Sequence, residues 1–570
     1  MRHSKHRNPQ VLHATLPILA AMLSACGGGS EATLPQLAAA PASLLSCADL
    51  AGRIAFPNTN ITSASVQAAG SITVAGALVE EHCKITGRMH ERVGPVDGQT
   101  YAIGFEMRLP KNWNGRFFHQ TNGGTDGNIV TASGGIGGGG PLLSNGLRQG
   151  FAVLSSDAGH TSSQNPLFGL DPQARLDYGY QAVGKLTPMA KSVIHTAYGK
   201  DPDRSYLVGC SNGGRHALVG AARYADQYDG ILAGHPGFNL PKSNIAMLHT
   251  AQQFNTVATD PQDLSSAFTQ TERNLVSRKI LDKCDALDGA VDGMVHDSKA
   301  CQSAFVLDRD VLTCSGARDG SCLSAAQKTA VRNVFNGPRD SAGAALYTSF
   351  PYDPGLTSSN WKSWRFVFPI TLSAVNMAFI FQTPPKPVSV LNDQKGFALA
   401  FDMDIDAPKI NASNATYTES AQAFMTPPNP NDLSRLRDRG AKLIIYHGLA
   451  DGTFSTDDTT AWYESLRAAN VRDVNDFSRL FLVPGMNHCG GGPAADQFDL
   501  VTALVNWVEK GQAPDGLIAS ARGVGNPGGV NAELPADWSA QRTRPLCSYP
   551  KIARYKGTGD IESAASFVCQ

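Results

Sequence analysis

Neither positive nor negative charge predominates in this chain. Its 570 residues include 48 lysines and arginines and 49 aspartates and glutamates, so the formal net charge is −1, and only 17% of the residues are charged. Without an excess of either sign, the composition favours neither nucleic acid nor an acidic partner. We therefore expect no nucleic-acid partner, and any electrostatic steering must be local.

Motifs of several other protein classes are also missing. The sequence shows no internal repeat, no coiled-coil period and no histidine pair with the spacing of metal ligands, so a metal-dependent hydrolase is not favoured. The glycine run at 134–140 lacks the Lys-Ser/Thr ending and the βαβ setting of a phosphate-binding loop. We interpret it as a flexible loop.

The apolar run near the start of the chain, VLHATLPILAAML, is too short to span a bilayer by itself. It follows a basic start and ends in Leu-Ser-Ala-Cys26, which resembles the bacterial lipobox, where the cysteine is lipidated and becomes the mature N-terminus. We interpret residues 1–26 as a lipoprotein signal peptide and residues 27–44 as a flexible tether. An ordinary secretory signal cleaved nearby is the alternative. Both predict export, to the outer membrane, periplasm or exterior, with membrane contact only through a lipid anchor.

The segment YLVGCSNGG at 206–214 has the form of a nucleophile elbow. An apolar run ends at Gly209, and the residues Gly-Cys-Ser-Asn-Gly fit G-x-S-x-G. In that pattern, small residues around a tight strand-to-helix turn leave the serine hydroxyl, here that of Ser211, exposed. Such turns also occur without chemistry, so the interpretation needs partners elsewhere in the chain.

A serine hydroxyl becomes a good nucleophile when a base takes its proton and an acid holds that base. In α/β-hydrolases the acid and then the histidine follow the serine along the chain. The run KLIIYHG is followed by Asp451, and RLFLVPG is followed by His488, so both lie just past predicted strands. The sequence therefore predicts the catalytic set Ser211, Asp451 and His488. His447 and Asp457 are the nearest alternatives, and we expect His447 to pack or to form hydrogen bonds locally.

The tetrahedral intermediate of acyl transfer needs two backbone N–H donors. One is expected from Asn212, the residue after the serine. The other is expected from the loop in RFFHQTNGGTDG, where two glycines allow a close approach of the backbone, and we favour Gly124 over Gly123.

Ten of the eleven cysteines remain when Cys26 is set aside, an even number in an oxidising compartment. Connectivity is not fixed by sequence in principle, but joining close neighbours leaves only Cys210 and Cys489, beside the candidate serine and histidine. A bond between these two would tie the serine to the histidine. The neighbour pairs are Cys47–Cys83, Cys284–Cys301, Cys314–Cys322 and Cys547–Cys569.

Short apolar segments and intervening helical stretches alternate along much of the chain. This alternation predicts an α/β fold with a mostly parallel sheet that is covered on both faces. The strand signal disappears between residues 239 and 430, which we interpret as a lid domain inserted between two parts of the core, 45–238 and 431–570. The predicted strands are 116–118, 151–154, 206–208, 230–233, 442–446 and 479–483, and the helical stretches include 183–198 and 499–509.

The segment CDALDGAVDGM at 284–294 has metal-binding character. Three carboxylates within eight residues, separated by glycines, suit a hard cation with oxygen ligands, although the spacing is not that of an EF-hand. A solvated acidic turn capped by a disulfide explains the composition equally well. A second acidic run, FDMDID at 401–406, alternates polar and apolar residues and predicts a half-exposed strand.

Together, the C-S-x-G-G elbow, MNHCGGG, YHGLAD and CDALDGAVDG resemble the tannase and feruloyl esterase family, from about Cys47 to Cys569. The resemblance implies an α/β-hydrolase core with a large lid and a disulfide between Cys210 and Cys489. It also implies a structural calcium ion in the lid. By motif, the calcium ligands fall on Asp285, Asp288 and Asp292 and on the carbonyls of Ala290 and Met294.

The family cleaves esters of aromatic acids, including ferulate, gallate and terephthalate monoesters. The stretches WNGRFF, FGLDPQARLD, LFLVPGMNHC and ARYKGTGDI resemble the terephthalate-monoester hydrolases of the family. A terephthalate monoester, however, carries a free carboxylate that needs cations or other donors in the lid, and WKSWRFVFPITLSAVNMAFIFQTPP offers only Lys362 and Arg365.

We therefore expect a monomeric serine esterase for small aromatic esters in general, rather than an enzyme dedicated to terephthalate. Trp364 and Phe454 are the expected aromatic walls of the substrate site, with Arg365 as a further contact. The alternative from another class is a catalytically silent lipoprotein that binds aromatic or polysaccharide ligands, and a broken triad would support it.

Overall fold

The computed structural model describes residues 38–136, 144–470 and 473–570. The predicted signal peptide with Cys26, most of the predicted tether and most of the glycine run at 134–140 lie outside these residues. In the part of the chain that is described, no helix combines the length and the apolar character that crossing a membrane would require.

Across the described residues, a nine-stranded mixed sheet runs in the order β13-β12-β11-β10-β8-β9-β6-β5-β2. Neighbours from β13 to β9 are parallel, whereas β6, β5 and β2 continue the sheet in antiparallel pairs. The strands are β2 (Thr59–Gln67), β5 (His82–Val93), β6 (Thr100–Pro110), β8 (Arg116–Thr121), β9 (Ala152–Ser156), β10 (Arg204–Cys210), β11 (Gly230–Gly234), β12 (Lys442–Gly448) and β13 (Ser478–Val483).

The helices and the smaller sheets surround this sheet. The helices are α1 (Leu50–Arg53), α2 (Pro172–Leu176), α3 (Ala182–Tyr198), α4 (Asn212–Arg223), α5 (Leu240–Asn255), α6 (Gln270–Cys284), α7 (Ser298–Ala304), α8 (Leu307–Asp310), α9 (Ala325–Asn336), α10 (Ser359–Lys362), α11 (Ala374–Phe379), α12 (Gln394–Ala400), α13 (Ala421–Met425), α14 (Ser434–Asp438), α15 (Thr456–Ala469) and α16 (Leu500–Lys510). The two-stranded sheets pair β1 (Ala42–Ser43) with β7 (Asn112–Trp113), β3 (Thr73–Val74) with β4 (Ala77–Leu78), β14 (Gly516–Ser520) with β15 (Thr543–Cys547), and β16 (Ala553–Tyr555) with β17 (Phe567–Cys569).

The central strands are apolar on both faces because helices cover both. Along β12, Leu443 and Ile445 belong to a buried cluster with side chains of α4 and α15, whereas Ile444 and Tyr446 belong to a cluster with side chains of α16. Strands buried on two faces have nearly continuous apolar sequences instead of an alternating pattern. This is why short apolar runs predict them.

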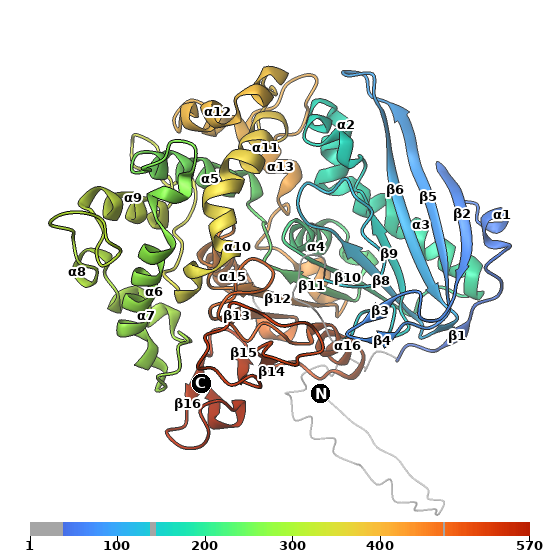
Figure 1. The fold of residues 1–570 in the computed structure, drawn as a ribbon. Coiled ribbons are helices and arrows are strands. Elements are labelled where there is room, and N and C mark those ends of the chain that lie inside the picture. The colour runs from blue at the N-terminus through green and yellow to red at the C-terminus, as the bar shows by residue number, and fades with distance from the viewer. Residues whose placement is uncertain (1–37, 137–143, 471–472) are drawn as a thin grey trace, which may run out of the picture. The chain divides into compact units, whose positions relative to one another are not determined.

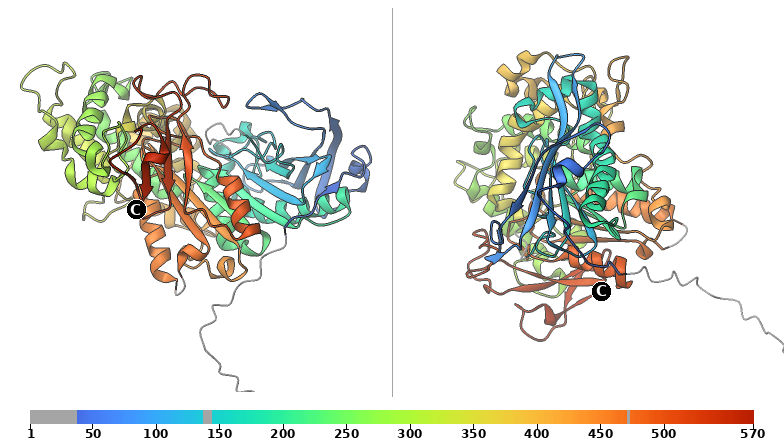
Figure 2. Two further views of the ribbon diagram at one scale, coloured as in Figure 1. Left: turned by 90° about the horizontal axis from the view of Figure 1, so that it is seen from below. Right: turned by 90° about the vertical axis from the view of Figure 1, so that its right-hand side faces the viewer.

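The chain between β11 and β12 is helical. Every residue of this interval is described, and none of them joins the large sheet. Side chains of α5, α6 and α9 form one buried cluster, and α5, α11, α12 and α13 contribute to a second. Figure 1 shows these green and yellow helices away from the blue strands β2, β5 and β6, and the left view of Figure 2 shows the same separation. The described residues nevertheless form one unit, so the division into core and lid stays a prediction.

The six predicted strands are confirmed as β8 to β13, and the two predicted helical stretches as α3 and α16. The antiparallel edge β2, β5 and β6 is not among the predicted strands. The strand predicted at 401–406 is wrong. There the Asp402 carboxylate accepts hydrogen bonds from the N–H groups of Asp404 and Ile405, and such local bonds stabilise a turn at the expense of strand pairing.

Five disulfides join the described cysteines in the pairing that the spacing suggests. Four link close neighbours in the sequence, and the fifth links Cys210 to Cys489.

Candidate active site

Ser211 lies in the turn between β10 and α4. Its φ of +65° and ψ of −126° are costly for a residue with a Cβ, and its N–H donates to the Gly234 carbonyl at 3.0 Å. Glycine is required on both sides. A Cβ on Gly209 would lie 2.6 Å from the carbonyl carbon of Gly213, and a Cβ on Gly213 would lie 2.4 Å from the carbonyl oxygen of Thr121. Close backbone packing therefore explains the small residues of the elbow.

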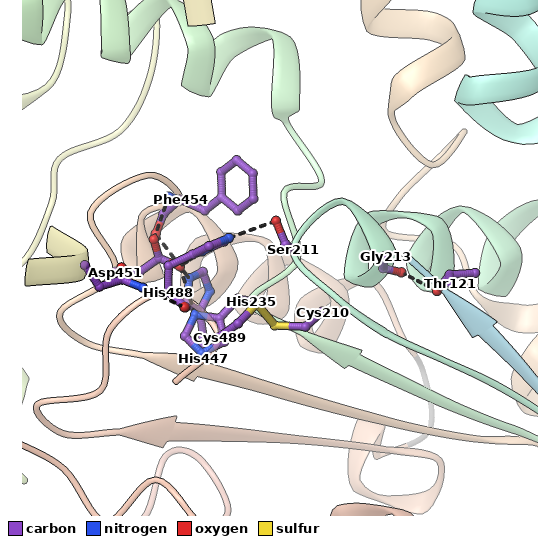
Figure 3. Close-up of a disulfide and its surroundings, with 11 residues drawn as sticks. Thr121, Cys210, Ser211, Gly213, His235, His447, Asp451, Phe454, His488 and Cys489 are labelled. Carbon is purple, nitrogen blue, oxygen red and sulfur yellow. Dashed lines mark hydrogen bonds and ion pairs between the residues drawn. A yellow bond between two sulfur atoms is a disulfide. The ribbon is translucent and has the colours of Figure 1, made fainter. Parts of the chain in front are cut away.

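The three predicted catalytic side chains meet beyond the carboxyl ends of the parallel strands (Figure 3). His488 Nε2 lies 2.8 Å from the Oγ of Ser211, and His488 Nδ1 lies 2.8 Å from the Oδ2 of Asp451. Ser211 and His488 are each 8% exposed, and Asp451 is 4% exposed. With Nδ1–H donated to the carboxylate, Nε2 is free to accept the serine proton, which is the geometry that general-base activation requires.

Asp451 is held as a carboxylate. Its Oδ1 accepts hydrogen bonds from the N–H groups of Thr453, at 2.8 Å, and Phe454, at 3.0 Å. Burial alone would raise the pKa of Asp451. The electrostatic interaction with His488 and the hydrogen bonds from the neighbouring imidazoles outweigh burial and hold this pKa well below its usual range. The acid beside His488 therefore remains ionised.

Two further histidines contact the same carboxylate oxygen. Asp451 Oδ2 lies 2.8 Å from His235 Nδ1 and 3.2 Å from His447 Nε2. His447 forms local hydrogen bonds, as expected, and one of them reaches the candidate catalytic acid. His235 was missed by the sequence analysis. The signal that could have found it is its position directly after the apolar run GILAG, which parallels the positions of Asp451 and His488 after their strands.

The Cys210–Cys489 disulfide joins the end of β10 to the loop that follows β13. The two cysteines are 279 positions apart, and their Cα atoms lie 6.2 Å from each other. Figure 3 shows this bond beside Ser211 and His488, the residues next to its two cysteines. It is a direct covalent link between the segments that carry the candidate nucleophile and base.

The two segments expected to supply the oxyanion donors lie beside Ser211. Asn212 is the first residue of α4, where an N–H has no intrahelical acceptor. A Cβ on Gly123 would lie 3.7 Å from the Cβ of Ser211, and Gly124 follows with a φ of +66°. Asp126 connects the two segments, because its Oδ2 accepts a hydrogen bond from Asn212 Nδ2 at 2.8 Å.

Of the expected substrate contacts, two reach the site and one does not. The rings of Trp364 and Phe454 approach the His488 ring with centroid separations of 4.8 and 5.2 Å. Arg365 is only 1% exposed. Its guanidinium lies 4.0 Å from the centroid of the Phe350 ring, inside the helical interval. A cation buried in this way is not presented to a substrate at Ser211.

The acidic loop after α6 is buried. Asp285, Asp288 and Asp292 are 8%, 1% and 7% exposed. Burial raises the pKa of Asp285, and it raises the pKa of Asp288 to about 7. Asp292 alone is compensated by a nearby cation, since its Oδ2 accepts a hydrogen bond from Arg544 Nε at 3.0 Å. Two buried carboxylates with unfavourable ionisation fit a hard divalent cation.

The comparison with protein families covers most of the chain. Residues 83–570 match the family described as tannase and feruloyl esterase. The chain belongs to this family. It is a carboxylic ester hydrolase of the tannase and feruloyl esterase type. Mono(2-hydroxyethyl) terephthalate hydrolase of Piscinibacter sakaiensis is 39% identical over 558 residues, which cover 91% of this chain and 90% of that protein. Probable feruloyl esterase B of Emericella nidulans is 28% identical, with 92% and 94% covered.

Two solved structures of the same kind share the fold. Feruloyl esterase B from Aspergillus oryzae has a TM-score of 0.72 at 24% identity and covers 92% of this chain and 99% of its own. Tannin acyl hydrolase from Aspergillus niger has a TM-score of 0.66 at 20% identity, with 93% and 96% covered. The family resemblance inferred from the motifs is confirmed by the family match over residues 83–570.

Proposed function

We propose that this family member hydrolyses esters of aromatic acids through a triad of Ser211, His488 and Asp451. The observation that carries the proposal is the continuous hydrogen-bonded path from the serine Oγ through the imidazole to the carboxylate, with both contacts at 2.8 Å. A catalytically silent binding protein is not favoured, because its expected sign is a broken triad.

In the proposed reaction, His488 takes the Ser211 proton as the serine oxygen attacks the ester carbonyl carbon. Asp451 stabilises the imidazolium that forms, and the N–H groups of Asn212 and Gly124 bind the oxyanion. His488 then protonates the leaving alcohol, and an acyl-serine remains. Water, deprotonated by His488, attacks this ester, and His488 returns the proton to the Ser211 oxygen as the aromatic acid leaves.

Esters of uncharged aromatic acyl groups fit the site best. Trp364 and Phe454 offer aromatic surface next to the His488 ring, against which a substrate ring can pack. Arg365 is no substrate contact in this proposal, because its guanidinium is buried against the Phe350 ring. We therefore propose a general aromatic esterase of the feruloyl and galloyl kind over an enzyme dedicated to terephthalate monoesters.

The test is a panel of methyl ferulate, methyl gallate, methyl benzoate and monomethyl terephthalate. The last two differ only by a free carboxylate, so their kcat/KM ratio isolates its recognition. We expect methyl benzoate to be preferred within this pair. A clear preference for monomethyl terephthalate would overturn the substrate proposal, and a phosphonate probe that labels a residue other than Ser211 would overturn the triad.

We further propose that a structural calcium ion binds the 284–294 loop. Its ligands would be the carboxylates of Asp285, Asp288 and Asp292 and the carbonyls of Ala290 and Met294. Bound there, the ion would compensate buried negative charge and stabilise the loop, with no part in ester cleavage. The support is the buried, oxygen-rich donor set.

Residues 239–430 are proposed to form a lid, since Trp364 of this interval contacts His488. Trp364→Ala should then raise KM for aromatic esters, and an unchanged KM would contradict that role.

Export is proposed from the disulfides, which suit an oxidising compartment. Mass spectrometry of the mature N-terminus would distinguish lipidation at Cys26 from simple cleavage, and sedimentation would test the proposed monomer.

A further inference from the structure

The pair of extra histidines beside Asp451 is unexplained by the triad. His235 and His447 are both 0% exposed. One ring nitrogen of each of these histidines and one carboxylate oxygen of Asp451 lie within 4.8 Å of one another, and Figure 3 shows all three residues close to His488. A triad needs one imidazole at its carboxylate, whereas this one has three.

His235 carries two local costs. Its φ of +40° is unusual for a non-glycine residue, and its buried Nε2 has no hydrogen-bond partner among the described residues. Burial lowers the pKa of His235 to about 3, so the ring is neutral. Its Nδ1 faces the Asp451 carboxylate, which can only accept a hydrogen bond. Nδ1 therefore carries the single proton of the neutral ring and donates a hydrogen bond to Asp451. Strain and a lost hydrogen bond at one buried residue point to a role beyond packing.

His447 is a donor for a different reason. Its Nδ1 lies 2.9 Å from the Thr459 hydroxyl, and its Nε2 lies 3.2 Å from Asp451 Oδ2 and 3.1 Å from the Phe454 carbonyl oxygen. Both neighbours of Nε2 are acceptors, so Nε2 must carry a proton. Nδ1 can then accept the hydrogen of the hydroxyl. Two fixed N–H groups therefore point at the oxygen that also contacts His488.

We propose that His235 and His447 are positioning residues for the reaction, a role that rests on the proposed triad. Their N–H groups hold Oδ2 of Asp451 in place under His488. Because they share the charge of that oxygen, they also limit the basicity that Asp451 confers on His488. Removing one donor should loosen the His488 ring and raise the pKa of this catalytic base.

The remaining ionisable groups near the cluster stay the same in every variant below. Arg365 and Tyr347 interact electrostatically with Asp451, and Asp457 interacts with His447. The Tyr446 ring lies 5.4 Å from the His235 ring. A change in the pH profile between matched variants therefore reports the altered donor.

Two matched pairs of variants test the inference. His447→Gln keeps an N–H near the Nε2 position, and His447→Met has the same length without a donor. His235→Asn keeps an N–H near the Nδ1 position and tolerates a positive φ, and His235→Leu removes the donor. We expect each donor-free variant to lose about tenfold to a hundredfold in kcat, the scale of a small misplacement, with little change in KM. The acid limb of kcat/KM should move to higher pH, and Gln and Asn should recover most of the loss.

Equal losses in both members of each pair, or an acid limb at its wild-type position in the donor-free variants, would overturn the inference. If one variant of a pair melts below the assay temperature, the pair at the other histidine serves as the test. Stoichiometric zinc in the purified protein would also overturn it, since metal-bound nitrogens carry no proton. Ser211→Ala in the same assay separates the two proposals. If Ser211→Ala is active, the proposed triad is wrong. If Ser211→Ala is inactive and the two members of each histidine pair have equal activity, only this inference is wrong.

Discussion

Ser211 and Cys489, on the two sides of the candidate reaction centre, both have backbone conformations with positive φ. Such conformations cost about 1–3 kcal/mol each and persist only where the surrounding structure enforces them. Here the glycines of the elbow allow the turn of α4 to approach Thr121, and the Cys210–Cys489 disulfide holds the two segments together. The serine hydroxyl is thereby placed at hydrogen-bonding distance from His488 without any rearrangement.

Ser211→Ala should abolish turnover while leaving the fold intact. Because the members of a triad act as a unit, kcat is expected to fall by roughly a factor of 10⁵ to 10⁶. The measurement is hydrolysis of an activated aryl ester, with the melting temperature as the control for folding. Activity within about tenfold of wild type would be inconsistent with Ser211 as nucleophile.

Gly213→Ala should destabilise the protein, because the new Cβ would lie 2.4 Å from the Thr121 carbonyl oxygen. Forced close contacts of this kind cost about 1–3 kcal/mol. The matched control is Gly52→Ala in α1, where a Cβ would meet no atom within 4 Å. Urea unfolding of both variants checks the prediction, and equal midpoints would contradict it.

Among the elements, the strand ends and the connections between them create the site. β10, β11, β12 and β13 are parallel neighbours, and their carboxyl ends lead into Ser211, His235, Asp451 and the loop of His488. The disulfide joins the first and last of these segments.

Away from the site, an ion pair connects β8 to α16. Arg116 Nε lies 2.6 Å from the Oε1 of Glu509, which also accepts a hydrogen bond from the Tyr206 hydroxyl at 2.8 Å.

Replacing Cys210 and Cys489 together by alanine should lower both stability and activity. The closed loop spans 279 positions, for which the chain-entropy relation gives roughly 5 kcal/mol. A displacement of about 1 Å between Ser211 and His488 would cost on the order of a hundredfold in kcat. Denaturant unfolding and kinetics measure the two effects, and the Cys314→Ala/Cys322→Ala variant, which removes a bond across only 8 positions, is the control. Full activity without the first bond would refute its positioning role.

The Arg116–Glu509 pair should make part of the stability acid-sensitive. Burial alone would raise the pKa of Glu509, but the hydrogen bonds from Arg116 and Tyr206 outweigh it, and the pKa lies below its ordinary value of 4.5. A carboxyl with a lowered folded-state pKa contributes stability above the unfolded-state pKa and loses it as pH falls through the folded-state value. The melting-temperature difference between wild type and Glu509→Gln should therefore be largest near neutral pH and shrink below about pH 4.5. A difference independent of pH would contradict this.

For the whole molecule, the loop that is proposed to bind calcium connects the helical interval to the C-terminal segments through Asp292. Arg544 of β15 pairs with Asp292, and Arg542 donates a hydrogen bond to the Asp292 carbonyl oxygen at 2.6 Å. A ligand that binds only the folded state stabilises it by about 4 kcal/mol at a thousand times its Kd. Chelation should thus lower the melting temperature, added calcium should restore it, and Asp288→Asn should weaken the response. An unchanged melting curve and no calcium by elemental analysis would contradict the site.

The local patterns in this sequence were sufficient for much of the result. Local sequence is enough to predict the elbow, the residues after the last strands and the close cysteine pairs. Steric requirements at turns and burial on both faces of a strand restrict the residue types within a few positions. On these grounds the sequence predicts the parallel strands and the family, which are confirmed, and it predicts the candidate triad Ser211, Asp451 and His488. It did not predict β2, β5 and β6, whose pairing depends on partners far along the chain.

The directions of the side chains, in contrast, follow from the tertiary structure. Arg365 and Trp364 are adjacent in the sequence, yet one is buried against Phe350 and the other lies on His488. His235 stands 216 positions from Asp451 and donates to its carboxylate. Composition and spacing carry no record of such contacts, because a side chain's direction is set by the helix or strand end that holds it and by the surfaces that fold against it.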